Sequence, residues 1–124
     1  MKTRIAIASQ GRGGLDDVIP QVFGRSPTFT IIDIEDGKVK RTKVENNPYA
    51  NASHGAGPLT CMRLNKLGVN VVVGASFGPT VSAILKEAEI EAVTANAGTE
   101  IESFIQQFLK TARDPGYSHL GTPR

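Results

Sequence analysis

The chain has 124 residues, a length that suits one domain with a core of its own. Its 14 basic and 12 acidic residues give a formal net charge of +2, and with 6% aromatic residues this balance does not indicate nucleic-acid binding. One cysteine excludes an internal disulfide, and no stretch approaches the roughly 20 apolar residues that span a bilayer. We therefore expect a cytoplasmic protein that binds neither nucleic acid nor a membrane.

The sequence reads as one domain over residues 1–112, followed by a flexible tail over residues 113–124. The tail carries Asp114-Pro115-Gly116 and Gly121-Thr122-Pro123, which cannot continue a helix. No long repeat or low-complexity segment divides the rest of the chain.

The first half of the chain predicts three strands. Residues 4–8 are apolar after Arg4 and run into a glycine-rich turn. Residues 28–34 are apolar on both alternating faces, as in a strand covered on both sides. Asp36-Gly37 predicts a hairpin, so residues 38–44 should return antiparallel. The basic side chains of this third strand are typical of an exposed edge that resists pairing; the alternative is a docking patch for an acidic partner.

The second half alternates helices and strands. Helices are predicted over residues 58–67, 79–88 and 100–112, with strands over 69–73 and 92–95. Apolar residues in the second and third helices recur at helical spacing and predict buried stripes.

These elements predict an α/β fold, a mixed five-stranded sheet flanked by three helices. Right-handed crossovers place the fourth strand beside the first and the fifth beyond it. The predicted order is 3-2-1-4-5 with strand 2 antiparallel, which is the ribonuclease-H-like arrangement. Loops over residues 9–27, 46–57, 74–79 and 95–99 then converge at one edge of the sheet, where open α/β sheets bind ligands.

The helix starts at this edge differ in how they are capped. Gly57-Pro58 and Gly78-Pro79 predict glycine N-caps, which leave the N–H groups of the first turn without a side-chain acceptor. The third helix start, by contrast, predicts a capping box between Thr99 and Glu102.

Free N–H groups and the helix dipole together favour a compact anion, whose charge Arg12 and Arg25 on the first loop would neutralise. The alternative is that water satisfies both caps and that the glycines only permit tight turns. His54 could ligate a metal, donate a hydrogen bond to an anion, or be an uninvolved loop residue. Cys61 lies on a buried helix arc and is expected to be inert, while Met62 lies off that arc.

The sequence lacks the residues that several kinds of catalysis require. A nuclease of this fold needs clustered carboxylates, but the first strand has none and Asp33 stands alone on the second. The glycine-rich turn lacks the G-x-G-x-x-G spacing, the phosphate loop motif is absent, and no serine has evident histidine and carboxylate partners. We therefore expect a non-catalytic protein.

Four short motifs, in order and spacing, resemble the dinitrogenase iron-molybdenum cofactor biosynthesis (nitrogenase accessory factor-like) family over about residues 3–110. They are Phe23-Gly24-Arg25-Ser26-Pro27, Glu45-Asn46-Asn47-Pro48, His54-Gly55-Ala56-Gly57, and Gly74 with Gly78-Pro79. The family is similar in fold to ribonuclease H and includes non-enzymatic carriers of iron-molybdenum cofactor or its precursors. It also includes the orange protein of sulfate-reducing bacteria, which holds a molybdenum-copper sulfide cluster.

The resemblance implies that the anion is a molybdenum-containing metal-sulfur cluster, either iron-molybdenum or molybdenum-copper, or an iron-sulfur cluster. The binding residues it implies are Arg12, Arg25, Gly55, Gly57 and Gly78, with His54 at the metal. It also implies a cluster-delivery or acceptor protein as partner. Relatives often have a histidine where this chain has Val22, so direct ligation here falls to His54 or is absent.

Two alternatives remain open at this point. A small domain could bind a phosphorylated metabolite at the same helix starts, because both ligands are anions that use the same donors. An interaction module could instead act through the basic edge strand.

Overall fold

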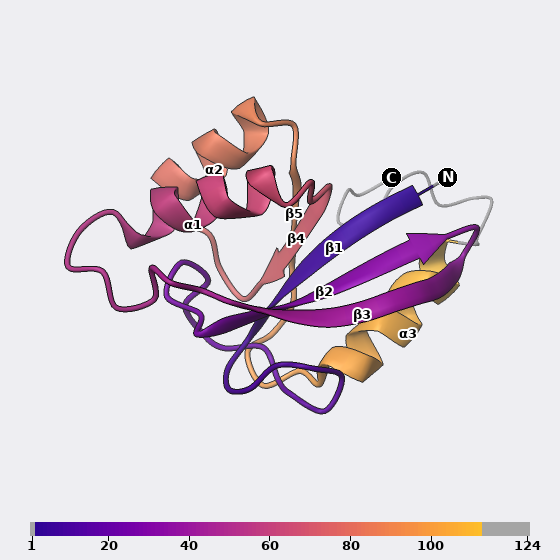
Figure 1. The fold of residues 1–124 in the computed structure, drawn as a ribbon. Coiled ribbons are helices and arrows are strands. Elements are labelled where there is room, and N and C mark those ends of the chain that lie inside the picture. The colour runs from indigo at the N-terminus through magenta and orange to yellow at the C-terminus, as the bar shows by residue number, and fades with distance from the viewer. Residues whose placement is uncertain (1, 113–124) are drawn as a thin grey trace.

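A computed structural model of the protein describes residues 2–112, and the predicted tail at 113–124 lies outside them (Figure 1). The elements in chain order are β1 (Lys2–Ser9), β2 (Thr28–Glu35), β3 (Lys38–Asn46), α1 (Ala56–Lys66), β4 (Val71–Gly74), α2 (Pro79–Glu87), β5 (Glu91–Thr94) and α3 (Ile101–Ala112). Across the described residues, none of the helices has the length and apolar character needed to cross a membrane.

The strand order is β3-β2-β1-β4-β5, as predicted. β2 pairs antiparallel with both β1 and β3, whereas β4 pairs parallel with β1 and with β5. Asp36 and Gly37 both have positive φ, 55° and 77°, which is the backbone of the type I′ turn predicted for the β2–β3 hairpin.

The sheet separates two apolar layers: α3 covers one face, and α1 with α2 covers the other (Figure 1). Strand alternation sends Ile5 and Ile7 toward α3 and sends Ala6 and Ala8 toward α1 and α2. The apolar side chains of β2 also alternate between the two layers, so the sequence prediction of a strand covered on both sides is confirmed.

An ion pair ties the sheet together at the end remote from the helix starts. Arg4 Nε lies 2.7 Å from Asp33 Oδ1 and Arg4 Nη2 lies 3.2 Å from Asp33 Oδ2, while Arg4 Nη1 donates to the carbonyl of Leu67 at 2.6 Å. The pair thus joins β1, β2 and the end of α1. The hydrogen bond and charge of Arg4 lower the pKa of Asp33 below its ordinary value of 3.8, and burial opposes this shift.

We predict that Asp33→Asn lowers the free energy of unfolding by up to about 1 kcal/mol at neutral pH, because it removes a half-exposed ion pair. A carboxylate with a lowered folded-state pKa stabilises the fold above its unfolded pKa, and it loses this effect as pH falls through the folded value. The variant should therefore approach the wild type below the ordinary Asp33 pKa of 3.8 in urea titrations over a pH series. Asp16→Asn, at an exposed acid, is the control; an equal loss there would contradict the assignment.

Candidate functional site

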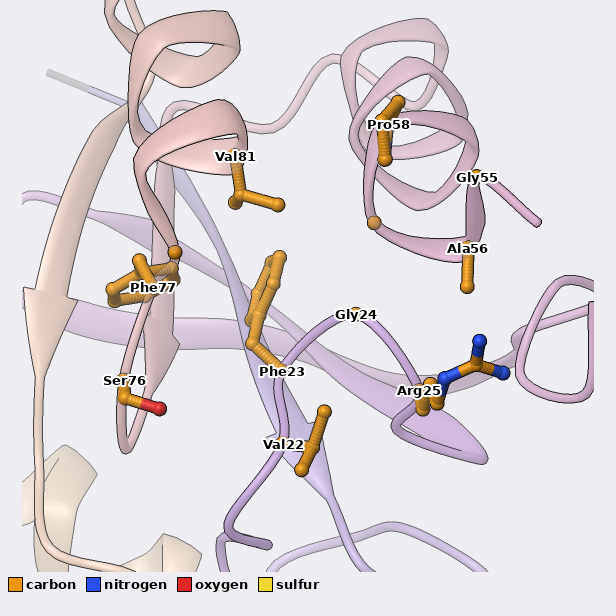
Figure 2. Close-up of a pocket in the computed structure, with 12 residues that line it drawn as sticks. Val22, Phe23, Gly24, Arg25, Gly55, Ala56, Pro58, Ser76, Phe77 and Val81 are labelled. Atoms are coloured by element: carbon orange, nitrogen blue, oxygen red, sulfur yellow. The ribbon is translucent and has the colours of Figure 1, made fainter.

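A pocket of about 300 Å³ lies between the starts of α1 and α2, above the segment of residues 22–25 (Figure 2). It is open to solvent where the predicted loops converge. Three of the four predicted loops contribute to its lining, and the fourth, at 95–99, bonds to Ile19 instead. The lining comprises Val22, Phe23, Gly24, Arg25, Gly55, Ala56, Gly57, Pro58, Ser76, Phe77, Gly78 and Val81.

Gly24 lies directly against main-chain atoms in the first turn of α1. A Cβ on Gly24 would lie 2.8 Å from Gly57 Cα and 3.2 Å from Gly57 N, and a Cβ on Gly57 would lie 2.7 Å from a methyl group of Val81. Both glycines are therefore required by packing. Gly78 differs, because a Cβ there would meet no atom within 4 Å.

Aromatic side chains form the floor of the pocket. Phe23 is 2% exposed, and its ring lies beside Phe77 and below Val81 in Figure 2. Its ring centroid lies 4.9 Å from that of Phe77 and 5.3 Å from that of Phe29. Val22 is 56% exposed and adds an apolar rim. The pocket is thus largely apolar in its side chains.

The start of α1 corrects one prediction. The helix begins at Ala56, and its N-cap is Gly55 in the left-handed region (φ 71°), so Gly57 is not the N-cap. Pro58 occupies the third helical position, which is tolerated because that N–H also lacks a partner within the helix. No side chain caps the helix, and within residues 2–112 the N–H groups of Ala56 and Gly57 have no hydrogen-bond acceptor.

α2 begins as predicted, with Gly78 as N-cap and Pro79 at the first position, again without a side-chain cap. The N–H groups of Thr80 and Val81 likewise have no recorded acceptor among the described residues. Two helix starts without side-chain caps therefore border one pocket, and each brings the positive end of its dipole to it.

The start of α3 corrects a second prediction. α3 begins at Ile101, and the Thr99–Glu102 capping box does not form around that start. The N–H groups of Ile101 and Glu102 donate instead to the main-chain carbonyls of Asp17 and Leu15, at 3.0 and 3.1 Å. The donors of α3 are thus used by a loop far away in sequence, which local patterns could not reveal.

Arg25 lines the pocket, but its guanidinium points toward the segment after β3 (Figure 2). Its Nη1 donates to the carbonyls of Ala50 and Ala52, at 3.2 and 2.9 Å. It therefore braces the loop that leads to His54 and Gly55 while it leaves a positive charge at the rim.

The structure does not bring Arg12 or His54 into the pocket lining. Arg12 is exposed on the glycine-rich turn, where the Asp17 carboxylate accepts hydrogen bonds from the N–H groups of Gly11, Gly13 and Val18, each at 2.8 Å. The donors of that turn are therefore bound by the chain's own acid. His54 is exposed immediately before Gly55, so its role stays a prediction.

Metal-ligating side chains are sparse in the structure. Among residues 2–112, no group of three or more His, Cys, Asp or Glu side chains could hold a metal ion. Cys61 is buried, and burial raises the pKa of its thiol to about 11, so it remains protonated at neutral pH, as its predicted inert role requires. Met62 is exposed, as predicted from its position on the helix.

Asn47 and Thr60 position the pocket wall, and sequence analysis did not single out either for that role. Asn47 is 8% exposed; its Nδ2 donates to the carbonyl of Ser26 at 2.9 Å and to Thr60 Oγ1 at 3.2 Å, and its Oδ1 accepts from the N–H of Tyr49 at 3.1 Å. Thr60 Oγ1 donates to the carbonyl of Gly24 at 3.0 Å. The available signal was the Asn-Asn-Pro motif after β3.

The domain is thus an α/β domain with a ribonuclease-H-like sheet, in which two uncapped helix starts lie beside an apolar pocket. Residues 1–111 match the family described as dinitrogenase iron-molybdenum cofactor, and the chain belongs to that family. An uncharacterised protein of Methanocaldococcus jannaschii is 32% identical over 88 residues, which are 71% of this chain and 74% of that protein.

Solved structures share the fold. The apo form of the orange protein from Desulfovibrio gigas is 28% identical, with a TM-score of 0.78 over 87% of this chain and 88% of that one. A candidate NifB protein of Thermotoga is 28% identical, with a TM-score of 0.65 over 98% of this chain and 97% of that one.

We predict that Gly24→Ala destabilises the protein by about 1–3 kcal/mol, because the added methyl group meets main-chain atoms that cannot rotate away. Gly78→Ala should cost less than about 1 kcal/mol, since its methyl group enters open space and only a glycine N-cap is lost. Urea unfolding measures both free energies. Equal losses of unfolding free energy in the two variants would show that the close contact between Gly24 and Gly57 does not exclude a side chain at residue 24.

Replacing Asn47 with alanine should lower the free energy of unfolding by about 1–3 kcal/mol, because it leaves buried main-chain and hydroxyl groups without partners. The neighbouring Asn46 is exposed, and Asn46→Ala should change stability by no more than about 0.5 kcal/mol. Thermal or urea unfolding compares the pair. A neutral Asn47→Ala variant would refute its role as the link between the pocket wall and α1.

Proposed function

We propose that the protein is a non-catalytic carrier that binds a molybdenum-containing or iron-sulfur cluster as cargo in the pocket between α1 and α2. Membership of the dinitrogenase iron-molybdenum cofactor family supports a role related to such clusters. The observation that carries the proposal is the pair of uncapped helix starts over one apolar pocket.

Metal-sulfur clusters match this pocket in charge and in surface chemistry. They are compact anions, so the N–H groups of Ala56, Gly57, Thr80 and Val81 and both helix dipoles would stabilise them. Arg25 would add positive charge at the rim. Their sulfide surface is softer and less strongly hydrated than phosphate, so it costs less to place against Phe23, Phe77 and Val81.

The remaining predicted residues take lesser roles in this proposal. Gly55 and Gly78 allow the helix starts to approach the cargo, and His54 is the first candidate for contact with metal from the edge of the site. Arg12 would act only through long-range charge, because the turn that carries it lies outside the pocket lining. A delivery or acceptor protein would load or unload the cluster at the open mouth.

The test is a titration of the purified protein with tetrathiomolybdate, with and without copper, followed by gel filtration. We expect stoichiometric retained colour. Gly78→Asp should abolish retention without unfolding the protein, because an Asp at this N-cap can accept from the free N–H groups of α2 and places a competing carboxylate in the site. Its unfolding midpoint should rise rather than fall.

Ser103→Asp is the matched control, since it adds the same charge in the first turn of α3, where neighbouring N–H groups are already bound. Its retention should equal that of the wild type. His54→Ala separates metal contact from main-chain binding: lost retention would assign His54 to the metal, and unchanged retention would leave the main-chain donors. Absence of retained metal from thiomolybdate and from iron-sulfur precursors would overturn the carrier proposal.

The phosphorylated-metabolite alternative uses the same four N–H donors. It predicts that inorganic phosphate raises the unfolding midpoint of the wild type and not of Gly78→Asp, while thiomolybdate leaves no retained colour.

A further inference from the structure

A second cavity, of about 460 Å³, lies at the other end of the sheet from the pocket. It is formed where β1 begins, where the β2–β3 hairpin turns, and beside the turn between α1 and β4. The pocket between α1 and α2 lies instead beyond the last residues of β4. The lining of this second cavity comprises Lys2, Thr3, Arg4, Asp33, Ile34, Glu35, Lys40, Arg41, Gly68 and Asn70.

Of the two acidic side chains that line this cavity, Asp33 is paired within the described chain and Glu35 is not. Arg4 holds Asp33 through two nitrogen-oxygen contacts. Farther along β3, Glu45 lies 3.2 Å from both Lys43 Nζ and Arg63 Nη2. Glu35 is the one lining carboxylate without an ion pair among the described residues.

Basic side chains outnumber the acidic ones here, although the charge of Arg41, opposite Asp33 in the strand register, helps to lower the pKa of Asp33. Within residues 2–112, no acidic group lies within ion-pair distance of four exposed cations. These are Lys2, Lys38, Lys40 and Arg41. Three of the four line the cavity, and Lys38 begins the strand beside it. The site therefore has a local excess of positive charge although the whole chain is nearly neutral.

The main chain of β3 offers a second kind of contact next to these charges. Among the strands of residues 2–112, β3 is the outermost and pairs with β2 alone, so one side of its backbone has no strand partner there. The register is regular from Arg41 to Asn46 and is broken at Lys40 by a bulge. Val39 and Val44 are about two-fifths exposed along the strand. An extended peptide can pair with such an edge through its own backbone.

We propose that the free edge of β3 and the basic rim of the neighbouring cavity dock an extended acidic segment of a partner protein. The peptide would add a strand beside residues 41–46, and its carboxylates would lie against Lys40 and Arg41, the lining residues that β3 itself contributes. A nucleic acid fits less well, because neither β3 nor the cavity lining carries an aromatic side chain for base stacking. The strand edge also matches a peptide backbone.

The experiment uses the full chain and a fluorescein-labelled peptide, as long as β3, in which Glu alternates with Val or Thr. Fluorescence anisotropy should show saturable binding at low ionic strength that disappears near 1 M salt, where the screening length falls to about 3 Å. The double variant Lys40→Glu and Arg41→Glu should weaken binding about tenfold or more. The same peptide with N-methyl groups on alternate residues should also bind more weakly, because it cannot complete the strand ladder.

The matched control combines Lys86→Glu on α2 with Lys110→Glu on α3, both at exposed positions. It changes net charge by the same amount and should bind the peptide like the wild type. Equal loss in both double variants, or no binding by the wild type, would overturn the proposal and leave the basic edge as protection against strand pairing. Undiminished binding of the N-methylated peptide would overturn strand addition.

A single-stranded oligothymidylate serves as competitor. Displacement of the peptide at lower concentrations of oligonucleotide than of unlabelled peptide would identify the patch as a nucleic-acid surface and refute the protein-partner proposal. Thiomolybdate retention is measured on the same variants. It should be unchanged by Lys40→Glu with Arg41→Glu, so failure of the docking proposal and failure of the carrier proposal are distinguishable.

Discussion

The main-chain contact between Gly24 and Gly57 is the constraint on which the candidate site depends. It lets the segment before β2 pass directly under the first turn of α1, at a distance that no side chain would allow. Phe23, the residue before Gly24, then packs against Phe77 and forms the floor of the pocket. Asn47 and Thr60 stabilise the same contact, because their side chains donate hydrogen bonds to carbonyls of the segment that carries Gly24.

The site is also defined by the donors that the fold does not use. The start of α3 and the glycine-rich turn also have main-chain N–H groups of the kind that bind anions. Loop carbonyls accept hydrogen bonds from those of α3, and the Asp17 carboxylate accepts them from those of the turn. Only α1 and α2, of the three described helices, reach the pocket with first-turn N–H groups that have no recorded partner. Since an uncompensated donor is costly to bury, an open pocket that can admit an anion or water is the arrangement in which such donors persist.

The two ends of the sheet are built for different contacts. At the ends of β1 and β4, most lining side chains are apolar, and the positive charge comes from two helix starts and from Arg25 at the rim. At the start of β1 and around the hairpin, it comes from side-chain cations that the local acids leave unpaired. The two surfaces lie at opposite ends of the sheet, so the cargo proposed for one end would leave the other end free for the proposed partner.

Much of this architecture followed from short-range sequence signals. Alternation in residues 28–34 indicated a strand between two layers, Asp36-Gly37 indicated the hairpin, and crossover handedness then ordered the strands. Those signals concern neighbours in the chain, and the strand order and the three-helix arrangement agree with them. Gly78-Pro79 also marked its helix start correctly.

Tertiary structure alone decided which features face the site. In the structure the N-cap of α1 is Gly55 and not Gly57. The first N–H groups of α3 donate to carbonyls distant in sequence, in place of a Thr99 capping box. The Asp17 carboxylate accepts hydrogen bonds from the turn that carries Arg12. The structure also shows that Gly24 and Gly57 serve packing. The sequence by itself determined the elements and their order because these depend on local geometry. The free donors were decided by contacts between segments far apart in the chain, which no local pattern encodes.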